Sequence, residues 1–314
     1  MSSLVPNPRS AQSAYSSQHL TGKLTDPFLL GFMVLYGLAF LGLVSAVPGE
    51  WQSALFLATG VVIVSAVVLV LFRGQIPHPV DTVRSRIELW LALMWFLGVY
   101  VLAAFTDAHG MEVVNGFTNW LFLFLVPLGF LRAVRGGSLR ETLSSAGLTR
   151  CGLGTALKMM LLTVLLFLPV ILGSVNGEQR EEILAVFFTP ARLAIVFPVS
   201  FVLALLLAGF TEEFFFRGVL QSRLAVVTGS EMRGLVVASL LFGVLHFPHA
   251  YFLSTWPTHE NLVWSLATVM TEYAITGVLL GVLWIKTHNL AASALVHSFV
   301  NALVLMTSIR IGVG

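Results

Sequence analysis

Two adjacent glutamates, Glu212 and Glu213, stand at the end of an apolar run from Leu193 to Thr211 and precede the sequence Phe-Phe-Phe-Arg. An acidic side chain at the centre of a membrane helix costs about 2.5–3.5 kcal/mol on insertion scales. A chain that carries two such side chains next to each other is expected to use at least one of them in chemistry. The alternative is a carboxylate pair at the interfacial end of a helix.

The spacing around the two glutamates predicts different roles for them. Glu213 and Arg217 are four residues apart, so they share a helix face with the acid before the base, which is the better order for an ion pair. Glu212 and Arg217 are five residues apart, which is about 140° around the helix. We therefore expect Arg217 to neutralise Glu213, while Glu212 points elsewhere as a general base.

Two later apolar segments add groups that can handle protons and polarise a carbonyl. Phe242 and His246 are four residues apart, as are His297 and Asn301, so each pair projects from one helix face. Two histidines, an acid and an amide can activate water and stabilise an oxyanion. Taken singly, each histidine is more simply a hydrogen-bonded packing residue, and Asn301 an interhelical hydrogen-bonding group.

The composition places these residues in a membrane. With 57% hydrophobic and 10% charged residues and a mean hydropathy of +0.91, the chain is predicted to be an all-α polytopic membrane protein rather than a soluble one. The net charge of +2 is too small to suggest a nucleic-acid partner. The single cysteine, Cys151, excludes a disulfide framework and a multi-cysteine metal site, and is expected to be a small packing residue.

Nine apolar stretches reach the length of about 20 residues that a membrane-spanning helix needs. The predicted helices, of which eight rather than nine is the alternative count, cover 28–47, 53–72, 88–105, 113–131, 156–175, 193–216, 234–250, 262–285 and 290–309. The expected organisation is a disordered polar tail over 1–26, transmembrane helices without motifs over 27–190, and a motif-bearing helical core over 191–314.

The basic residues predict the orientation. With nine helices, all but Arg180, Arg192 and Arg310 of the 17 Lys and Arg residues fall on the side of the N-terminus, which the positive-inside rule makes cytoplasmic. Counted from the nearest inner basic residues at 1.5 Å per residue, Glu212, His246 and His297 all lie about 17–20 Å deep. For Glu212 this depth requires its helix to continue well beyond Arg217.

The chain thus contains three motifs, in order and on separate apolar segments: Glu212-Glu213-x-x-x-Arg217, Phe242-x-x-x-His246 and His297-x-x-x-Asn301. Each motif is weak by itself, but the ordered set is specific. It resembles the CAAX prenyl protease and bacteriocin-processing (CPBP, Abi-like) intramembrane protease family. The resemblance lies in the C-terminal region, and the first 190 residues carry no motif of the family.

The resemblance implies hydrolysis of peptide bonds inside the membrane. By motif position, Glu212 and His246 would activate the attacking water, His297 and Asn301 would hold the oxyanion, and the rest of the first motif would support them. No cofactor is expected. A zinc ion held by Glu212, His246 and His297 with an open coordination position is the alternative.

Several further residues could serve such a site. Glu272 is predicted to lie about 21 Å deep, where an acid should face the cavity or pair with a histidine or water, in a supporting or purely structural role. His249 follows His246 by three residues and ranks below it. Gly277 and Gly281 are expected to permit close helix packing rather than to touch substrate.

The leading functional hypothesis is an intramembrane endopeptidase. Its partners would be the lipid bilayer and a membrane-anchored peptide or protein substrate, and one chain holds all the motif residues. A proton- or ion-coupled transporter is a rival, because buried acids and histidines form proton relays, although inverted repeats are not evident. A non-catalytic membrane immunity or scaffold protein is a third possibility. Small size and sparse loops favour a prokaryotic cell (inner) membrane, where prenylated tails are unlikely substrates.

Overall fold

Long apolar helices make up most of the molecule. The computed structural model describes residues 26–47, 49–72, 82–110 and 116–309, and these residues form no strand. Among them, eight helices are long and apolar enough to cross a membrane, or nine if one bent pair of helices is a single span. The predicted all-α, multi-helical membrane architecture is confirmed. The orientation of the N-terminus stays a prediction, and the polar tail except Asp26 lies outside the described residues.

The helices follow the predicted apolar segments within a few residues, except where noted below. The N-terminal region contains the helical segments α2 (Pro27–Ala46), α3 (Trp51–Leu71), α4 (Thr82–Ala108), α5 (Gly116–Asn119), η1 (Trp120–Leu125), α6 (Val126–Arg135) and α8 (Leu153–Ser174). The motif-bearing region contains α10 (Pro190–Ala204), η2 (Leu205–Gly209), α11 (Phe210–Glu213), η3 (Phe214–Gln221), α12 (Ser222–Thr228), α13 (Glu231–Leu245), α14 (Phe247–Phe252), α15 (Leu262–Thr268), η4 (Val269–Ala274), α16 (Ile275–Thr287) and α17 (Leu290–Ser308).

Two short helices were not predicted. The span that ends with α6 turns by 110° into α7 (Leu139–Ser145). Gly136 ends α6 with a φ of 65°, and Ser138 then starts α7 through a capping box with Glu141. The polar segment after α8 forms α9 (Gly177–Phe187), whose first turn is capped by the side chain of Asn176.

The helix that carries the two glutamates is longer than predicted. It is continuous over the 39 residues from Pro190 to Thr228, although parts of it are π-helical. It ends at Gly229, which has a φ of 67°. The prediction that it ends at residue 216 was therefore wrong, because an apolar stretch marks only the part of a helix that faces lipid or core. The continuation that Glu212 needs to reach the depth of the histidines is present.

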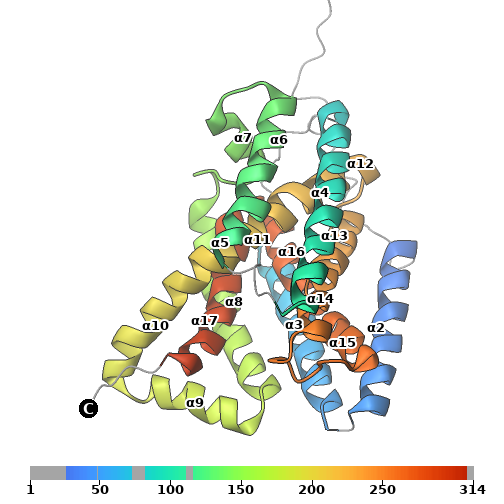
Figure 1. Cartoon of the computed structure of the whole chain (residues 1–314). Coiled ribbons are helices and arrows are strands. Elements are labelled where there is room, and N and C mark those ends of the chain that lie inside the picture. The colour runs from blue at the N-terminus through green and yellow to red at the C-terminus, as the bar shows by residue number, and fades with distance from the viewer. Residues whose placement is uncertain (1–25, 48, 73–81, 111–115, 310–314) are drawn as a thin grey trace, which may run out of the picture.

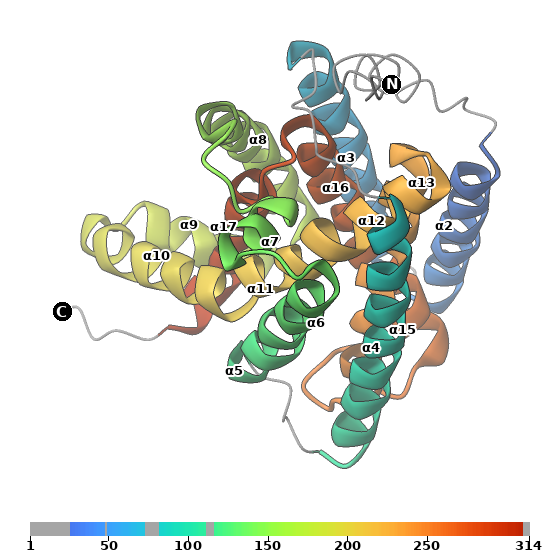
Figure 2. The same ribbon diagram turned by 90° about the horizontal axis from the view of Figure 1, so that it is seen from above.

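The last helices form the centre of the bundle, and the first helix lies at its rim. In the most apolar 18-residue stretch of the spans Leu262–Thr287 and Leu290–Ser308, 67% and 61% of the residues are buried. In the corresponding stretch of α2 the share is only 11%. Figure 1 and Figure 2 both show α2 at one edge of the molecule, where it packs against α15. The helix α10–α12 crosses the molecule beside α17. This packing brings the first and third motifs together.

Glycines allow the closest of these approaches. A Cβ on Gly281 would lie 2.2 Å from Leu235 Cδ1, and one on Gly277 would lie 3.2 Å from the Cα of Ser239, so α16 packs directly on α13. The packing role predicted for this pair is confirmed. A Cβ on Gly209 would lie 2.2 Å from Ser298 Oγ and 3.0 Å from a backbone oxygen of α17. The first motif can therefore approach α17 only because residue 209 is a glycine.

A Gly209→Ala variant is expected to lose about 1–3 kcal/mol of stability, the usual cost of overpacking, because the added methyl pushes the helix away from α17. Thermal unfolding in detergent would measure the loss. The matched control is Gly98→Ala in α4, where no heavy atom lies within 4 Å of the added Cβ. An equal stability for the two variants would contradict the close approach.

The turn between α16 and α17 fixes the start of the third-motif helix. Asn289 caps α17 by accepting a hydrogen bond from Ala291 N at 2.9 Å, and its Nδ2 donates to the carbonyl oxygens of Thr149 and Cys151 at 2.8 and 2.9 Å. Burial lowers the pKa of neighbouring His288 to about 4. Cys151 is exposed, so its predicted packing role was wrong. Only its backbone serves the fold, because it lies in the loop before α8.

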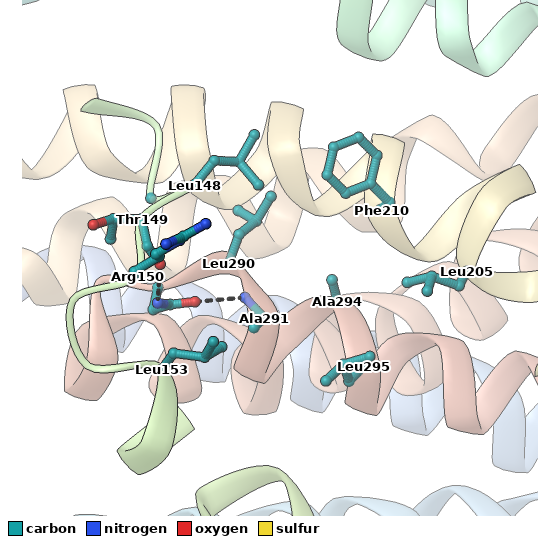
Figure 3. Close-up of a pocket in the computed structure, with 12 residues that line it drawn as sticks. Leu148, Thr149, Arg150, Leu153, Leu205, Phe210, Leu290, Ala291, Ala294 and Leu295 are labelled. Atoms are coloured by element: carbon teal, nitrogen blue, oxygen red, sulfur yellow. Dashed lines mark hydrogen bonds between the residues drawn. The ribbon is translucent and has the colours of Figure 1, made fainter. Parts of the chain in front are cut away.

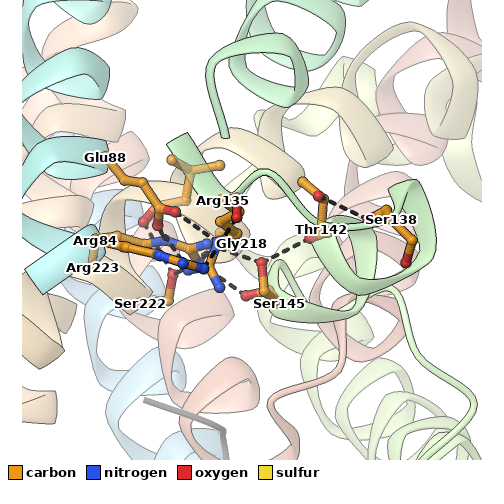
Figure 4. Close-up of polar contacts among 10 residues, drawn as sticks. Arg84, Glu88, Arg135, Ser138, Thr142, Ser145, Gly218, Ser222 and Arg223 are labelled. Atoms are coloured by element: carbon orange, nitrogen blue, oxygen red, sulfur yellow. Dashed lines mark hydrogen bonds and ion pairs between the residues drawn. The ribbon is translucent and has the colours of Figure 1, made fainter. Parts of the chain in front are cut away.

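A buried ion cluster joins the N-terminal region to the motif-bearing region. Glu88 of α4 is fully buried, and its carboxylate binds Arg135 of α6 at 2.6 Å and Arg223 of α12 at 2.8 Å. The guanidinium of Arg223 also donates a hydrogen bond to the backbone oxygen of Ser145 in α7, at 3.0 Å (Figure 4). Three elements without a motif are thus tied to the helix that carries the glutamates.

Candidate active site

The two glutamates of the first motif lie in a short α-helical turn between two π-helical segments. This turn is α11, and η2 and η3 flank it. π-Helical insertions change the direction in which the following side chains point, and they are frequent at functional sites. Both glutamates are buried, with exposed fractions of 8% for Glu212 and 0% for Glu213.

Glu213 is paired as the spacing predicted. Arg217 Nε lies 3.1 Å from Glu213 Oε2, and both side chains are fully buried. The guanidinium also approaches Gln221, whose Nε2 donates to the backbone oxygen of Gly281 at 3.0 Å. The predicted ion pair is confirmed, and a second polar side chain anchors it to α16.

Glu212 faces His297 instead. Its Oε2 lies 3.9 Å from His297 Nε2 and makes no hydrogen bond with any described residue. His297 Nδ1 lies 3.2 Å from Glu213 Oε1. A carboxylate in an ion pair can only accept a hydrogen bond, so Nδ1 donates to Glu213 and the opposite ring nitrogen is directed toward Glu212. His297 thus stands between the two glutamates, one turn of α17 before Asn301.

His246 lies at the break between α13 and α14. Its Nδ1 lies 2.8 Å from the carbonyl oxygen of Phe242, which can only accept, so Nδ1 carries the proton. In the neutral ring, Nε2 is then a proton acceptor. The ring stacks on Tyr273 of η4 with centroids 4.1 Å apart and an interplanar angle of 19°. This stacking holds His246 in one orientation.

Phe242 connects the three motifs. Its ring centroid lies 5.0 Å from that of His246 and 5.6 Å from that of His297. The guanidinium carbon of Arg217 lies 5.4 Å from the same centroid, within the range of a cation–π contact. One aromatic ring therefore contacts a side chain of every motif. Because Glu212 faces His297, we treat Glu212, His246 and His297 as one cluster, which their similar predicted depth allows.

Residues 194–303 match the family model described as "Rce1-like: Type II CAAX prenyl endopeptidase Rce1-like". We call this stretch of the chain the Rce1-like domain, after the model that it resembles. The match begins in α10 and ends in α17, so it includes all three motifs and the whole cluster. At the level of the family, it supports a CAAX-type intramembrane protease. No curated protein and no solved structure matches the chain.

Three further predicted residues of the Rce1-like domain make no hydrogen bond or ion pair with the cluster. Glu272 is exposed and pairs with no histidine among the described residues, so the expected pairing is not found. It precedes Tyr273 in η4, and it is the tyrosine that contacts His246. His249 pairs instead with a carboxylate of α4, Asp107, at 2.5 Å. Asn301 is half-buried, and its amide makes no hydrogen bond with a described residue.

Sequence reasoning missed three polar or aromatic residues around the site. Tyr273 and Gln221 stand among apolar residues of their helices, and nothing in their spacing marks them. Asp107 had a recognisable signal, since it is an acid near the end of an apolar stretch, like Glu212. It was overlooked because it lies in the region without motifs.

The alternative zinc site would need Glu212, His246 and His297 to converge on one ion. Within the described ranges, no group of three or more His, Cys, Asp or Glu side chains is placed to share one metal ion. Glu212 and His297 face each other, and Nδ1 of His246 donates to a backbone oxygen, which leaves its Nε2 as the acceptor.

An apolar cavity of about 420 Å³ adjoins the first and third motifs. Figure 3 shows it between Phe210 and Leu205 of the glutamate-bearing helix and Ala294 of α17, with the loop at Leu148 as a further wall. Phe210 precedes Glu212 by two residues, and Ala294 precedes His297 by three. The cavity thus lies along the same two helices as Glu212 and His297, and none of the residues that line it belongs to a motif.

Proposed function

We propose that the Rce1-like domain cleaves a peptide bond of a membrane-anchored peptide or protein, with Glu212 as the general base. The observation that carries this proposal is the difference between the two buried glutamates. Arg217 neutralises Glu213, whereas Glu212 Oε2 makes no hydrogen bond with a described residue and faces His297. A buried carboxylate without a hydrogen-bond donor is costly, and a catalytic use explains why it is retained.

The proposed reaction begins with a water molecule between Glu212 and His246. Glu212 takes a proton from the water while Nε2 of His246 accepts the second hydrogen bond, and the oxygen attacks the scissile carbonyl carbon. The carbonyl electrons move onto its oxygen. His297, protonated on both nitrogens, and the amide of Asn301 donate hydrogen bonds to this oxyanion. The carbonyl then re-forms, the C–N bond breaks, and Glu212 returns its proton to the departing amine.

We propose that the hydrolysis needs no tightly held metal. The donor geometry described above supports this view. A chelator such as 1,10-phenanthroline is expected to leave the cleavage rate of purified protein unchanged, and a rate restored only by added zinc would overturn the proposal.

The proposed substrate is a membrane-anchored segment whose apolar part lies against the cavity beside Phe210. We further propose a location in a prokaryotic cell (inner) membrane with the N-terminus in the cytoplasm, from the loop lengths and the distribution of basic residues. A sorting signal, a peptide precursor or another membrane protein would suit this location.

The test uses purified protein in liposomes with libraries of membrane-anchored peptides. His297→Ala is expected to reduce cleavage by about 10²-fold or more, the usual cost of losing one oxyanion donor. The matched control is His259→Ala, because this partly exposed histidine lies in the loop between α14 and α15, belongs to no motif and is paired with Glu260. Equal cleavage by the wild type and His297→Ala would contradict the proposal.

The same liposomes separate the protease from its rival. A proton-coupled transporter would move protons across the bilayer, which a pH-sensitive dye inside the liposomes reports. Proton movement in the absence of any cleavage would favour the transporter, and the absence of both would favour a non-catalytic protein.

A further inference from the structure

Helix α4 carries a buried carboxylate near each end, and each binds a cationic or imidazole side chain of the Rce1-like domain. Near the first end is Glu88, which binds Arg223. Near the C-terminal end of α4 is Asp107. Its side chain is fully buried, and its Oδ2 lies 2.5 Å from His249 Nδ1. The two contacts lie 19 residues apart, about 28 Å along the helix at 1.5 Å per residue. Helix α4, which lies outside the family match, therefore contacts the domain through a buried carboxylate near each of its ends.

The second of these contacts acts next to the candidate site. His249 belongs to α14, a six-residue helix that starts immediately after His246. His246 stands between the two helices, as the C-cap of α13 and the N-cap of α14, and Pro248 cannot donate the backbone hydrogen bond that a regular helix would have at this point. The direction of the His246 side chain therefore depends on how α14 is held.

Helix α14 is held from two sides. On one side, Thr258 and Ser265 donate hydrogen bonds to the backbone oxygen of Ala250 at 2.6 and 3.2 Å. On the other side α14 packs on α4, where the polar contact is that between Asp107 and His249. A buried carboxylate can only accept, so Nδ1 of His249 donates and its Nε2 faces away from Asp107.

We propose that Asp107 and His249 are positioning residues of the active site, which fix α14 against α4 and thereby hold His246 at the helix break in its working orientation. The inference rests on the proposed function for its effect on the reaction. It assigns a task to the region without motifs, because α4 supplies one half of the pair. Neither residue needs to touch the substrate.

The kinetic test compares Asp107→Asn, His249→Gln and the double variant with the wild type in liposomes. Each single variant is expected to lower kcat by about 10-fold or more, as for other partners that orient a site residue, with KM changed less than 2-fold. The double variant should lose no more than the worse single variant, because the two residues act as one unit. Losses that multiply in the double variant would overturn the proposal.

The control is another carboxylate that joins two helices. Asp26, at the start of α2, binds Arg233 of α13 at 3.0 Å, far along α13 from His246. Asp26→Asn is expected to leave kcat unchanged. An equal loss of kcat in Asp26→Asn and Asp107→Asn would show that any weakened helix contact has this effect, and would contradict a positioning role.

A measurement without substrate separates this inference from the proposed function. The ¹⁵N spectrum of histidine-labelled protein, assigned with His246→Gln, reports the environment and tautomer of His246. Its signal is expected to shift or broaden in Asp107→Asn and in His249→Gln, but not in Asp26→Asn. An unchanged His246 signal would overturn the inference, while absent cleavage in the wild type together with the expected shift would overturn only the proposed function.

Discussion

Glu212→Gln is expected to lower the cleavage rate by about 10²–10⁴-fold, which is the range that a positioned general base contributes. The amide keeps the size of the side chain but cannot take a proton from water. The protein should remain folded, because Glu212 Oε2 makes no hydrogen bond with a described residue that the change would break. The measurement is the rate of peptide cleavage in liposomes, with the thermal unfolding midpoint recorded on the same samples.

Glu213→Gln is the matched variant, since it makes the same change one residue later. It removes the partner of a fully buried guanidinium, and breaking a buried ion pair costs about 3–5 kcal/mol. Its main effect should therefore be a lower unfolding midpoint. If Glu213→Gln kept full stability and lost activity, while Glu212→Gln unfolded early and still cleaved peptides, the roles given to the two glutamates would be reversed.

The Glu88→Gln variant is expected to lose about 3–5 kcal/mol of stability, because it leaves two arginines near each other without their shared carboxylate. Glu88 is fully buried and binds both Arg135 and Arg223, and the latter is itself 2% exposed. The loss should appear as an earlier unfolding transition in detergent. It should also loosen α4 from the helix that carries the glutamates, since Arg223 lies on that helix.

Asp26→Asn serves as the control for stability as well. The side chain of its partner Arg233 is 36% exposed, and ion pairs near the surface contribute only about 0–1 kcal/mol. The unfolding midpoint of Asp26→Asn should stay close to that of the wild type. A midpoint for Glu88→Gln that matches the control would contradict the view that this cluster joins the two regions.

Periodicity and apolar length predicted most of the helices, because each depends on residues that are neighbours in the chain. The same local rule predicted the pairing of Glu213 with Arg217, four residues apart on one face. It failed where a helix extension is decided elsewhere. The extension to Thr228 is supported by the buried contacts of Arg223 with α4 and α7. The bend into α7, by contrast, has a local signal in Gly136 and Ser138 that the apolar pattern does not register.

The sequence by itself determined which residue types could do chemistry, their order and their approximate depth, since these follow from the chain and from the rise per residue of a helix. Only the tertiary structure decided how they meet. His297 stands between Glu212 and Glu213 because Gly209 lets two helices approach closely, and Asp107 reaches His249 because α4 packs on α14. Such contacts depend on the distance and crossing of helices far apart in the chain, which no local spacing encodes.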